Sequence, residues 1–508
     1  MEDSAHPPQA DRIGGVWGGY AMIAMLAAAT GLASGMRHMR AVSPAPPPGA
    51  QEAVGRPPPP PSLERPPQAA SPGEAPVPDR RQEGAAAEET PRPYAGFRHP
   101  HFRDPAGSMR HFFTALAAAE EGSAPGPVRA VYFGNSEIGF DRVTSQVRRS
   151  LQARFGDGGK GFMVIAPGWR YQRHRDVRWT VSDGWKVHTV LEGGLDDRRY
   201  GLGGVLAVNE GPAWVEYAAL SPRESRRGGY LDFPAGARFS RFELHYQAYP
   251  GGGDVRIEVD GGSSSATVRT NAYGTRDKVF AMELDDAPHR VRVSAGDFPA
   301  RLYGAVLERD RGFVLDAVMV IGAWANTQLN YDPDHLRRQV AARKPDLVIF
   351  QWGAKELMRK PYLTDRQARS FRRAYVKSIG RTMTGRPEAS CLVVSPKDMG
   401  MRKRNLIVSR PAVRKVVAAA EQAAAQAGCA YVDLFEALGG EGTMARWYLR
   451  RPRLVSPDLG HIMRPGAIAV GNVLSAMLFD AYRQSQEGPR GAPPARPARD
   501  LGARAGPS

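Results

Sequence analysis

The sequence contains very little cysteine: only Cys391 and Cys429 occur among its 508 residues. This scarcity excludes a disulfide-rich scaffold and any cysteine-rich metal site. Each cysteine opens a predicted strand, so the two thiols would lie close together if those strands were neighbours. We expect two buried free cysteines rather than a bridge, because unpaired cysteine is among the most buried residue types. We expect neither a metal nor an organic cofactor.

Acidic residues are also in short supply, with 52 Asp and Glu against 69 Lys and Arg, a formal net charge of +17 and a pI near 10.0. Such a charge makes nucleic acid, membrane surfaces and anionic polymers candidate partners. Almost all of the excess falls between Arg337 and Lys415, without a nucleic-acid-binding motif. We favour a solvated arginine-rich surface, with anionic glycan or lipid headgroups as the alternative, and expect no nucleic acid.

Only one uncharged run is long enough to cross a bilayer, residues 13–36 within a predicted N-terminal region of residues 1–40. We expect an uncleaved signal anchor in the membrane; a cleaved signal peptide and a buried soluble helix are the alternatives. Either exported interpretation places the remainder in the periplasm or cell envelope. Residues 41–95 are proline-rich and predict a disordered linker, and residues 486–508 predict a disordered tail.

A short stretch near the middle of the first half predicts a strand, a tight turn and a helix. Val131, Tyr132 and Phe133 are β-formers, turn residues follow, and apolar residues then recur at helical spacing from Val143. Ser136 therefore lies at a strand-to-helix junction, where backbone N–H groups and the helix dipole can stabilise an oxyanion. A simple N-cap is the alternative for a lone serine.

More than three hundred residues downstream, Asp458 precedes His461 by three positions in a loop ahead of a predicted terminal helix over 467–482. An aspartate at this spacing can hold an imidazole in one tautomer and direct it toward a distant serine. Ser136, Asp458 and His461 are therefore the candidate catalytic triad.

The chain between these two stretches changes its periodicity twice. Residues 165–312 contain short alternating strands at close spacing, which predict an all-β sandwich or jelly roll. From Phe313 onward strands alternate with helices, which predicts a parallel sheet covered on both faces. Ser136, Gly322, Lys355 and His461 would then lie in loops at the carboxyl ends of the strands.

Four blocks together resemble the SGNH (GDSL-type) hydrolase superfamily: Gly-Asn-Ser136, Ile321-Gly322-Ala323, Gln351-Trp-Gly353-Ala-Lys355-Glu and Asp458-x-x-His461. Further stretches, including Ser395-Pro-Lys-Asp398-Met, resemble the peptidoglycan and polysaccharide O-acetylesterases. The resemblance implies an α/β fold with a three-layer, doubly wound parallel sheet made from residues 96–164 and 313–485. Residues 165–312 would be an inserted β-module similar to carbohydrate-binding modules.

The resemblance implies an exported serine esterase that removes O-acetyl groups from an envelope polysaccharide such as peptidoglycan. It also implies an oxyanion hole formed by the backbone N–H groups of Ser136 and Gly322 and a side chain from the third block. Lys355 stands where the family has asparagine, and its ammonium can complete the oxyanion hole or point away. We favour the second arrangement, with the lysine in a surface charge cluster with Glu356. A catalytically impaired glycan-binding protein and an O-acyltransferase on the same scaffold are the alternatives to the esterase.

Overall fold

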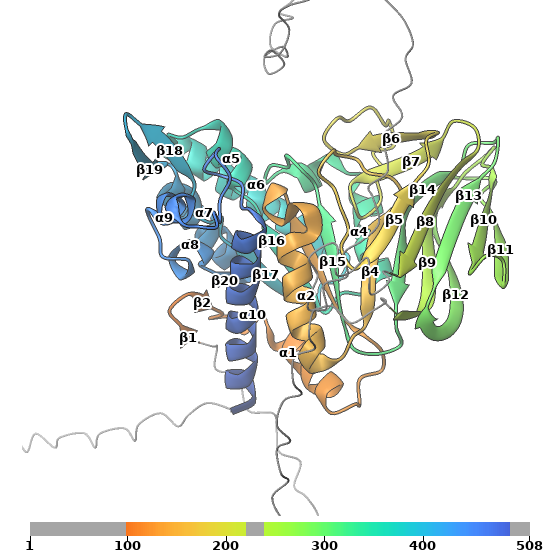
Figure 1. Cartoon of the computed structure of the whole chain (residues 1–508), viewed down its shortest axis with the longest axis horizontal. Coiled ribbons are helices and arrows are strands. Elements are labelled where there is room, and N and C mark those ends of the chain that lie inside the picture. The colour runs from red at the N-terminus through yellow and green to blue at the C-terminus, as the bar shows by residue number, and fades with distance from the viewer. Residues whose placement is uncertain (1–97, 220–237, 488–508) are drawn as a thin grey trace, which may run out of the picture. The chain divides into compact units, whose positions relative to one another are not determined.

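The computed structural model describes residues 98–219 and 238–487 (Figure 1). The predicted membrane segment at 13–36, the linker at 41–95 and nearly all of the predicted tail lie outside these residues. The last helix runs through Glu487, so residues 486–487, assigned to the tail, are helical. Within the two described ranges, no helix combines the length and apolar character needed to cross a bilayer.

The α/β part is built on a seven-stranded sheet, in which five neighbouring strands, including the strand at one edge, are parallel. The two strands at one edge are antiparallel. In spatial order the strands are β1 (Arg98–His99), β2 (Phe102–Arg103), β20 (Ala430–Val432), β17 (Ser390–Val394), β16 (Leu347–Gln351), β3 (Val128–Gly134) and β15 (Phe313–Met319). A separate hairpin pairs β18 (Gly400–Lys403) with β19 (Leu406–Ser409).

Helices cover both faces of this sheet because successive strand residues point to opposite sides. Ala130 and Tyr132 of β3 belong to one buried cluster, and Val131 and Phe133 belong to the other. The first cluster is packed by α1 (Arg110–Glu120), α2 (Arg142–Phe155) and α10 (Arg464–Glu487). The second is packed by α4 (Pro333–Arg343), α5 (Ala354–Arg359), α6 (Asp365–Met383) and α7 (Val413–Ala427). The shorter elements are η1 (Ser136–Asp141), η2 (Thr327–Asn330), α8 (Leu434–Ala437) and α9 (Thr443–Leu449). The predicted three-layer α/β fold is confirmed.

Two antiparallel sheets form the inserted β-rich part, as the alternating pattern predicts. One contains β11 (Ser264–Arg269), β10 (Asp254–Val259), β13 (Arg290–Ala295), β8 (Ala213–Ala219) and β5 (Val177–Val181). The other contains β12 (Arg276–Pro288), β9 (Arg238–Ala248), β14 (Arg301–Glu308), β7 (Val205–Asn209) and β6 (Trp185–Thr189). Their inner faces share one apolar cluster, with Ile257 and Val293 from the first sheet and Leu244 and Leu302 from the second.

Strand β4 (Gly159–Val164) links the two parts, because it pairs antiparallel with β14 of the second sheet. Gly161 has a φ of 80°, and a β-carbon there would lie 2.3 Å from a carboxylate oxygen of Asp316 in β15. That carboxylate also accepts the Phe162 N–H at 2.7 Å. The glycine is required because only a bare backbone fits between the two sheets at this position.

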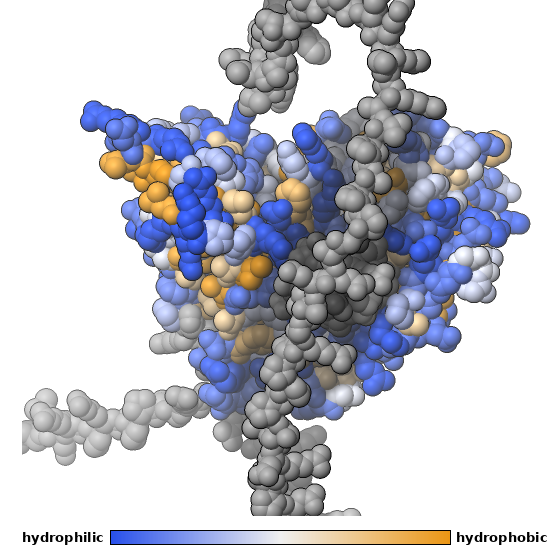
Figure 2. All heavy atoms as spheres, in the orientation of Figure 1, coloured by the Kyte–Doolittle hydropathy of each residue, from blue (hydrophilic) through white to orange (hydrophobic). Residues whose placement is uncertain are grey.

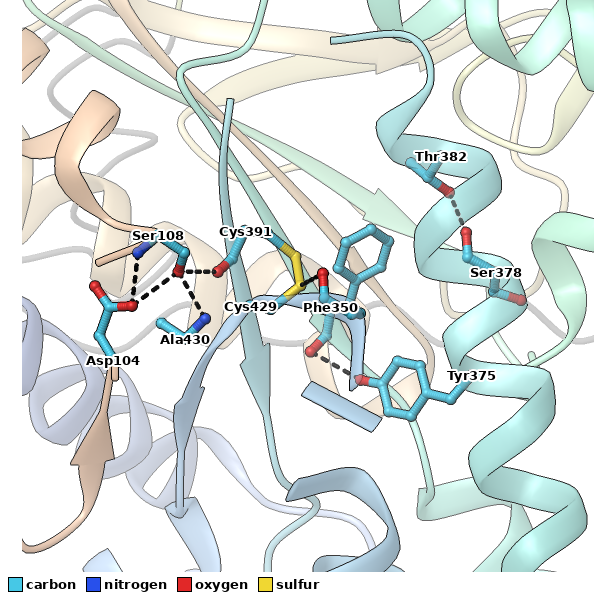
Figure 3. The surroundings of a disulfide bond; sticks show 10 residues. Asp104, Ser108, Phe350, Tyr375, Ser378, Thr382, Cys391, Cys429 and Ala430 are labelled. Atoms are coloured by element: carbon cyan, nitrogen blue, oxygen red, sulfur yellow. Dashed lines mark hydrogen bonds between the residues drawn. A yellow bond between two sulfur atoms is a disulfide. The ribbon is translucent and has the colours of Figure 1, made fainter. Parts of the chain in front are cut away.

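Cys391 and Cys429 form a disulfide, so the expectation of two free thiols was wrong (Figure 3). Their Cα atoms are 4.7 Å apart because β17 and β20 are neighbours, with Leu392 opposite Ala430. The Ser108 hydroxyl connects the same two strands, because it donates to the Cys391 carbonyl at 3.3 Å and accepts the Ala430 N–H at 2.8 Å.

Four of the basic residues between Arg337 and Lys415 lie on one exposed face of α6. Arg366, Arg369, Arg373 and Lys377 recur there at spacings of three and four residues and are all exposed. The part of the described surface visible in Figure 2 is mostly hydrophilic, with smaller apolar patches.

Candidate active site

Ser136 opens η1 directly after β3 and is partly exposed. The preceding Asn135 is buried, and its side-chain oxygen accepts the Glu137 N–H at 3.1 Å. Asn135 thus caps the turn that presents the serine, which gives the asparagine of the Gly-Asn-Ser block a structural role here.

The turn differs from the prediction in one respect, because α2 does not begin directly after the serine. Gly139 is extended with a ψ of 153°, and Phe140 is left-handed with a φ of 61°. These two residues break the helix, and α2 starts only at Arg142. The N-terminus of α2 is therefore displaced along the chain from Ser136, and the expected helix-dipole contribution does not follow from this arrangement.

The structure brings Ser136, His461 and Asp458 together. His461 Nε2 lies 3.2 Å from Ser136 Oγ, and His461 Nδ1 lies 2.5 Å from an oxygen of Asp458. Partial burial alone would raise the pKa of Asp458, but hydrogen bonds from His461, Ser456 and the Gly460 N–H hold this pKa well below its usual range. The aspartate is therefore ionised at neutral pH and can orient a neutral or a protonated imidazole.

Gly322 and Lys355, the other predicted members of the site, also lie together. Gly322 follows β15 with a φ of 91°. Lys355 Nζ is 3.7 Å from the position that a β-carbon on Gly322 would occupy, and 5.8 Å from the centroid of the Trp324 ring. The lysine thus reaches the second block instead of pointing away into a surface charge cluster.

Glu356, the expected partner of that cluster, points inward. The side chain is buried, and one oxygen accepts the Ala325 N–H at 3.1 Å. The other oxygen has no hydrogen-bond partner within the described residues. Burial raises the pKa of Glu356 to about 7, against the smaller opposing effect of the Ala325 N–H.

A buried lysine that the sequence did not mark as functional bridges the two halves of the site. Lys397 Nζ donates to Glu137 Oε1 at 3.0 Å and to the carbonyl oxygen of Gly460. The Lys397 and Glu137 side chains are 1% and 6% exposed. Because Glu137 follows Ser136 and Gly460 precedes His461, this bridge sets the distance between nucleophile and base. The Ser-Pro-Lys397-Asp motif was the available signal, but its role depends on contacts that only the fold creates.

A second charged cluster lies just beyond the serine turn. Asp141 is fully buried, and its carboxylate contacts the Arg148 guanidinium at 3.0 Å and Lys160 Nζ at 2.5 Å. Arg148 also pairs with Asp176, which immediately precedes β5. Burial alone would raise the pKa of Asp141, but the charges of Arg148 and Lys160 hold this pKa well below its usual range.

The candidate triad opens into a hollow of about 360 Å³. Apart from the triad and its neighbours, its wall is largely apolar or aromatic, with one arginine: Phe140, Arg142, Tyr171, Ile321, Ile462 and Ala467. In the part of the chain that the structure describes, no group of three or more His, Cys, Asp or Glu residues could hold a metal.

No family model matches the chain, and no curated protein matches it. Among solved structures, a peptidoglycan O-acetylesterase is similar at a TM-score of 0.58 and 18% identity, over 74% of this chain and 96% of that chain. The chain therefore has an SGNH/GDSL esterase-like fold with an additional all-β region. A family two carbohydrate esterase from Cellvibrio japonicus also matches, at 9% identity over 60% of this chain and 98% of that chain, but its TM-score of 0.24 is too low to bear on the fold.

Proposed function

We propose that this protein is a serine esterase that removes O-acetyl groups from an envelope polysaccharide such as peptidoglycan. The observation that carries the proposal is the continuous contact from Ser136 Oγ through His461 to Asp458. The fold similarity to a peptidoglycan O-acetylesterase supports the choice of substrate class.

In this mechanism His461 Nε2 accepts the hydroxyl proton as Ser136 Oγ attacks the ester carbonyl. The tetrahedral oxyanion accepts hydrogen bonds from the backbone N–H groups of Ser136 and Gly322, with Lys355 Nζ as the third donor. Collapse of the tetrahedral intermediate breaks the bond to the sugar oxygen, which takes the proton from His461 and leaves as a hydroxyl, and acetyl-Ser136 remains. Water, deprotonated by His461, then releases acetate and regenerates the serine.

We further propose that the protein acts outside the cytoplasm and is held at the membrane by residues 13–36. The Cys391–Cys429 disulfide supports export, because such bonds persist mainly in oxidising compartments. Thiol labelling of intact cells and of fractionated membranes would test both statements. Free thiols in a cytoplasmic, soluble pool would contradict them.

Turnover of 4-nitrophenyl acetate tests the esterase activity. Ser136→Ala and His461→Ala should each reduce kcat at least about 10³-fold, and the double variant should be no worse, because nucleophile and base act as a unit. Ser370→Ala, at an exposed serine on α6, is the matched control and should keep full activity. Equal activity in wild type and Ser136→Ala would contradict the assignment. A wild type without activity would favour the catalytically impaired glycan-binding protein.

Acetate release from acetylated peptidoglycan tests the polysaccharide substrate separately. Transfer of the acetyl group to an added glycan hydroxyl, in place of its transfer to water, would identify an acyltransferase instead. Both outcomes are read from the same reaction by measuring free acetate and acetylated acceptor.

A further inference from the structure

Two aromatic side chains from separate parts of the chain meet at the candidate pocket. Phe140 lies near the end of the serine turn η1, and Tyr171 lies between β4 and β5, at the beginning of the inserted region. Their ring centroids are 5.6 Å apart with an interplanar angle of 40°. Both line the same hollow as Ser136 and His461.

Tyr171 is not used as a core residue, since it is 49% exposed. Its ring is flanked by the guanidinium of Arg170 at 5.5 Å. A tyrosine presents a flat apolar ring together with a polar hydroxyl, a combination typical of sites that contact ligands. Its exposure at the rim of the pocket is therefore better explained by contact with substrate than by folding.

Phe140 has a backbone conformation that bulky residues rarely adopt, with a φ of 61°. Such strain costs roughly 1–3 kcal/mol and persists only where the surroundings impose it. Here Arg175 imposes it from the inserted region, because its backbone N–H donates to Asp141 at 3.0 Å and its Nε donates to the Phe140 carbonyl at 3.1 Å. The segment that carries Tyr171 is thereby fixed to the turn that carries Ser136.

The hollow is also larger than the acyl group requires. About 360 Å³ lies within the range of roughly 300–1,000 Å³ typical of pockets for whole small molecules. An acetyl group has two carbon atoms, so there is room for part of the alcohol that carries it. The C–H faces of a sugar ring are apolar, and they pack well on an aromatic ring placed at the mouth of such a pocket.

We propose that Tyr171, supported by Phe140, forms a stacking subsite for the sugar ring that carries the ester. This inference rests on the proposed esterase function and deepens it. In this proposal Tyr171 favours sugar acetates over small acetates as substrates. It takes no part in the chemical steps. The inserted β-rich region would then contribute a specificity residue to the site through its first connecting segment.

Two substrates separate selection from chemistry: vinyl acetate, which has no ring, and peracetylated methyl glucoside. In the full chain, Tyr171→Ala should lower kcat/KM for the sugar acetate about tenfold, mainly through KM. The loss on vinyl acetate should be clearly smaller, because that ester has no ring to stack on Tyr171. Tyr171→Phe keeps the ring and should retain both activities. Tyr273→Ala, at an exposed tyrosine of the β-rich part, is the matched control.

Calorimetric binding of the same sugar acetate to Ser136→Ala, with and without Tyr171→Ala, keeps the two proposals distinguishable. A wild type that hydrolyses neither ester contradicts the esterase proposal, whereas the binding measurement still decides on the subsite. Weaker binding in the double variant supports the subsite. Equal binding, or equal losses of activity on both esters, would overturn it.

Discussion

Asp458 and Asp141 are two carboxylates near Ser136 that differ in their surroundings and in their proposed roles. Asp458 has a side chain that is 45% exposed and is paired with His461, whereas Asp141 is fully buried between Arg148 and Lys160. The pKa of each lies well below its usual range, so both are ionised. They differ in their partners. Asp458 is paired with an imidazole, which can accept and return a proton, whereas Asp141 is paired with a guanidinium, which stays protonated. The first pair is suited to proton transfer, and the second to holding structure.

The largest effect should come from Asp458→Asn, which breaks the exposed pair without leaving a buried charge. The amide cannot hold His461 in the required tautomer, so kcat for 4-nitrophenyl acetate should fall about 10⁴-fold. The melting temperature should change little, since the side chain is half-exposed. A loss of activity below tenfold would show that the aspartate does not orient the base.

Asp141→Asn should have the opposite profile, a large loss of stability. It would leave Lys160 and Arg148 buried with less negative charge, and we expect the free energy of unfolding to fall by about 3–5 kcal/mol. Urea denaturation followed by circular dichroism measures this. Asp183→Asn, at an exposed aspartate, is the control and should change it by less than about 0.5 kcal/mol. Similar results for both variants would refute the structural role.

Glu356 adds a third carboxyl to the comparison: it is buried, and within residues 98–219 and 238–487 no cation is hydrogen-bonded to it. Its pKa rises from 4.5 to about 7 on folding, so between these values the folded state keeps a proton that the unfolded state releases. Stability should therefore fall as pH rises through this window, by about 3 kcal/mol. Glu356→Gln, which keeps the acceptor for Ala325, should remove that dependence. The measurement is the free energy of unfolding in urea from pH 4.5 to 7.5. The same pH dependence in wild type and Glu356→Gln would contradict the prediction.

Substitution of Lys355 should have the smallest effect, and it extends the comparison from carboxylates to lysines. Unlike Lys160, it is only partly buried, and it lies beside Gly322. If it donates to the oxyanion, Lys355→Ala should lower kcat about 10²-fold, whereas Lys355→Asn should retain most of the rate through its amide. Steady-state kinetics on 4-nitrophenyl acetate decides. Equal rates in all three proteins would remove the lysine from the site.

The fold was largely predictable because its elements have long, regular apolar patterns. The alternation after Phe313 and the period-two strands of residues 165–312 each reflect burial on a defined face. The same patterns predicted Ser136 and His461 in loops at the carboxyl ends of the parallel strands, and in the structure their side chains are in contact.

The details that escaped prediction depend on contacts between distant segments. The disulfide requires β17 and β20 to be neighbours in one register, although the cysteines are separated by 38 positions. Lys397 acquires its role only when Glu137 and Gly460 are brought to it. The left-handed Phe140 is imposed by Arg175, from beyond β4, so no local pattern around the serine could indicate it.

Strand β4 limits how this protein could be taken apart or recombined. By sequence it continues the α/β part, but by hydrogen bonding it completes the edge of β14 from Gly304 to Glu308. Cutting the chain at Ile165 would strip that edge and leave unpaired backbone groups that invite aggregation. The β-rich part is therefore not a cassette that begins where its own alternating pattern begins. A graft onto another esterase would have to include residues 159–164. The recipient would also need a hydrogen-bond acceptor for this strand in the place that Asp316 occupies here.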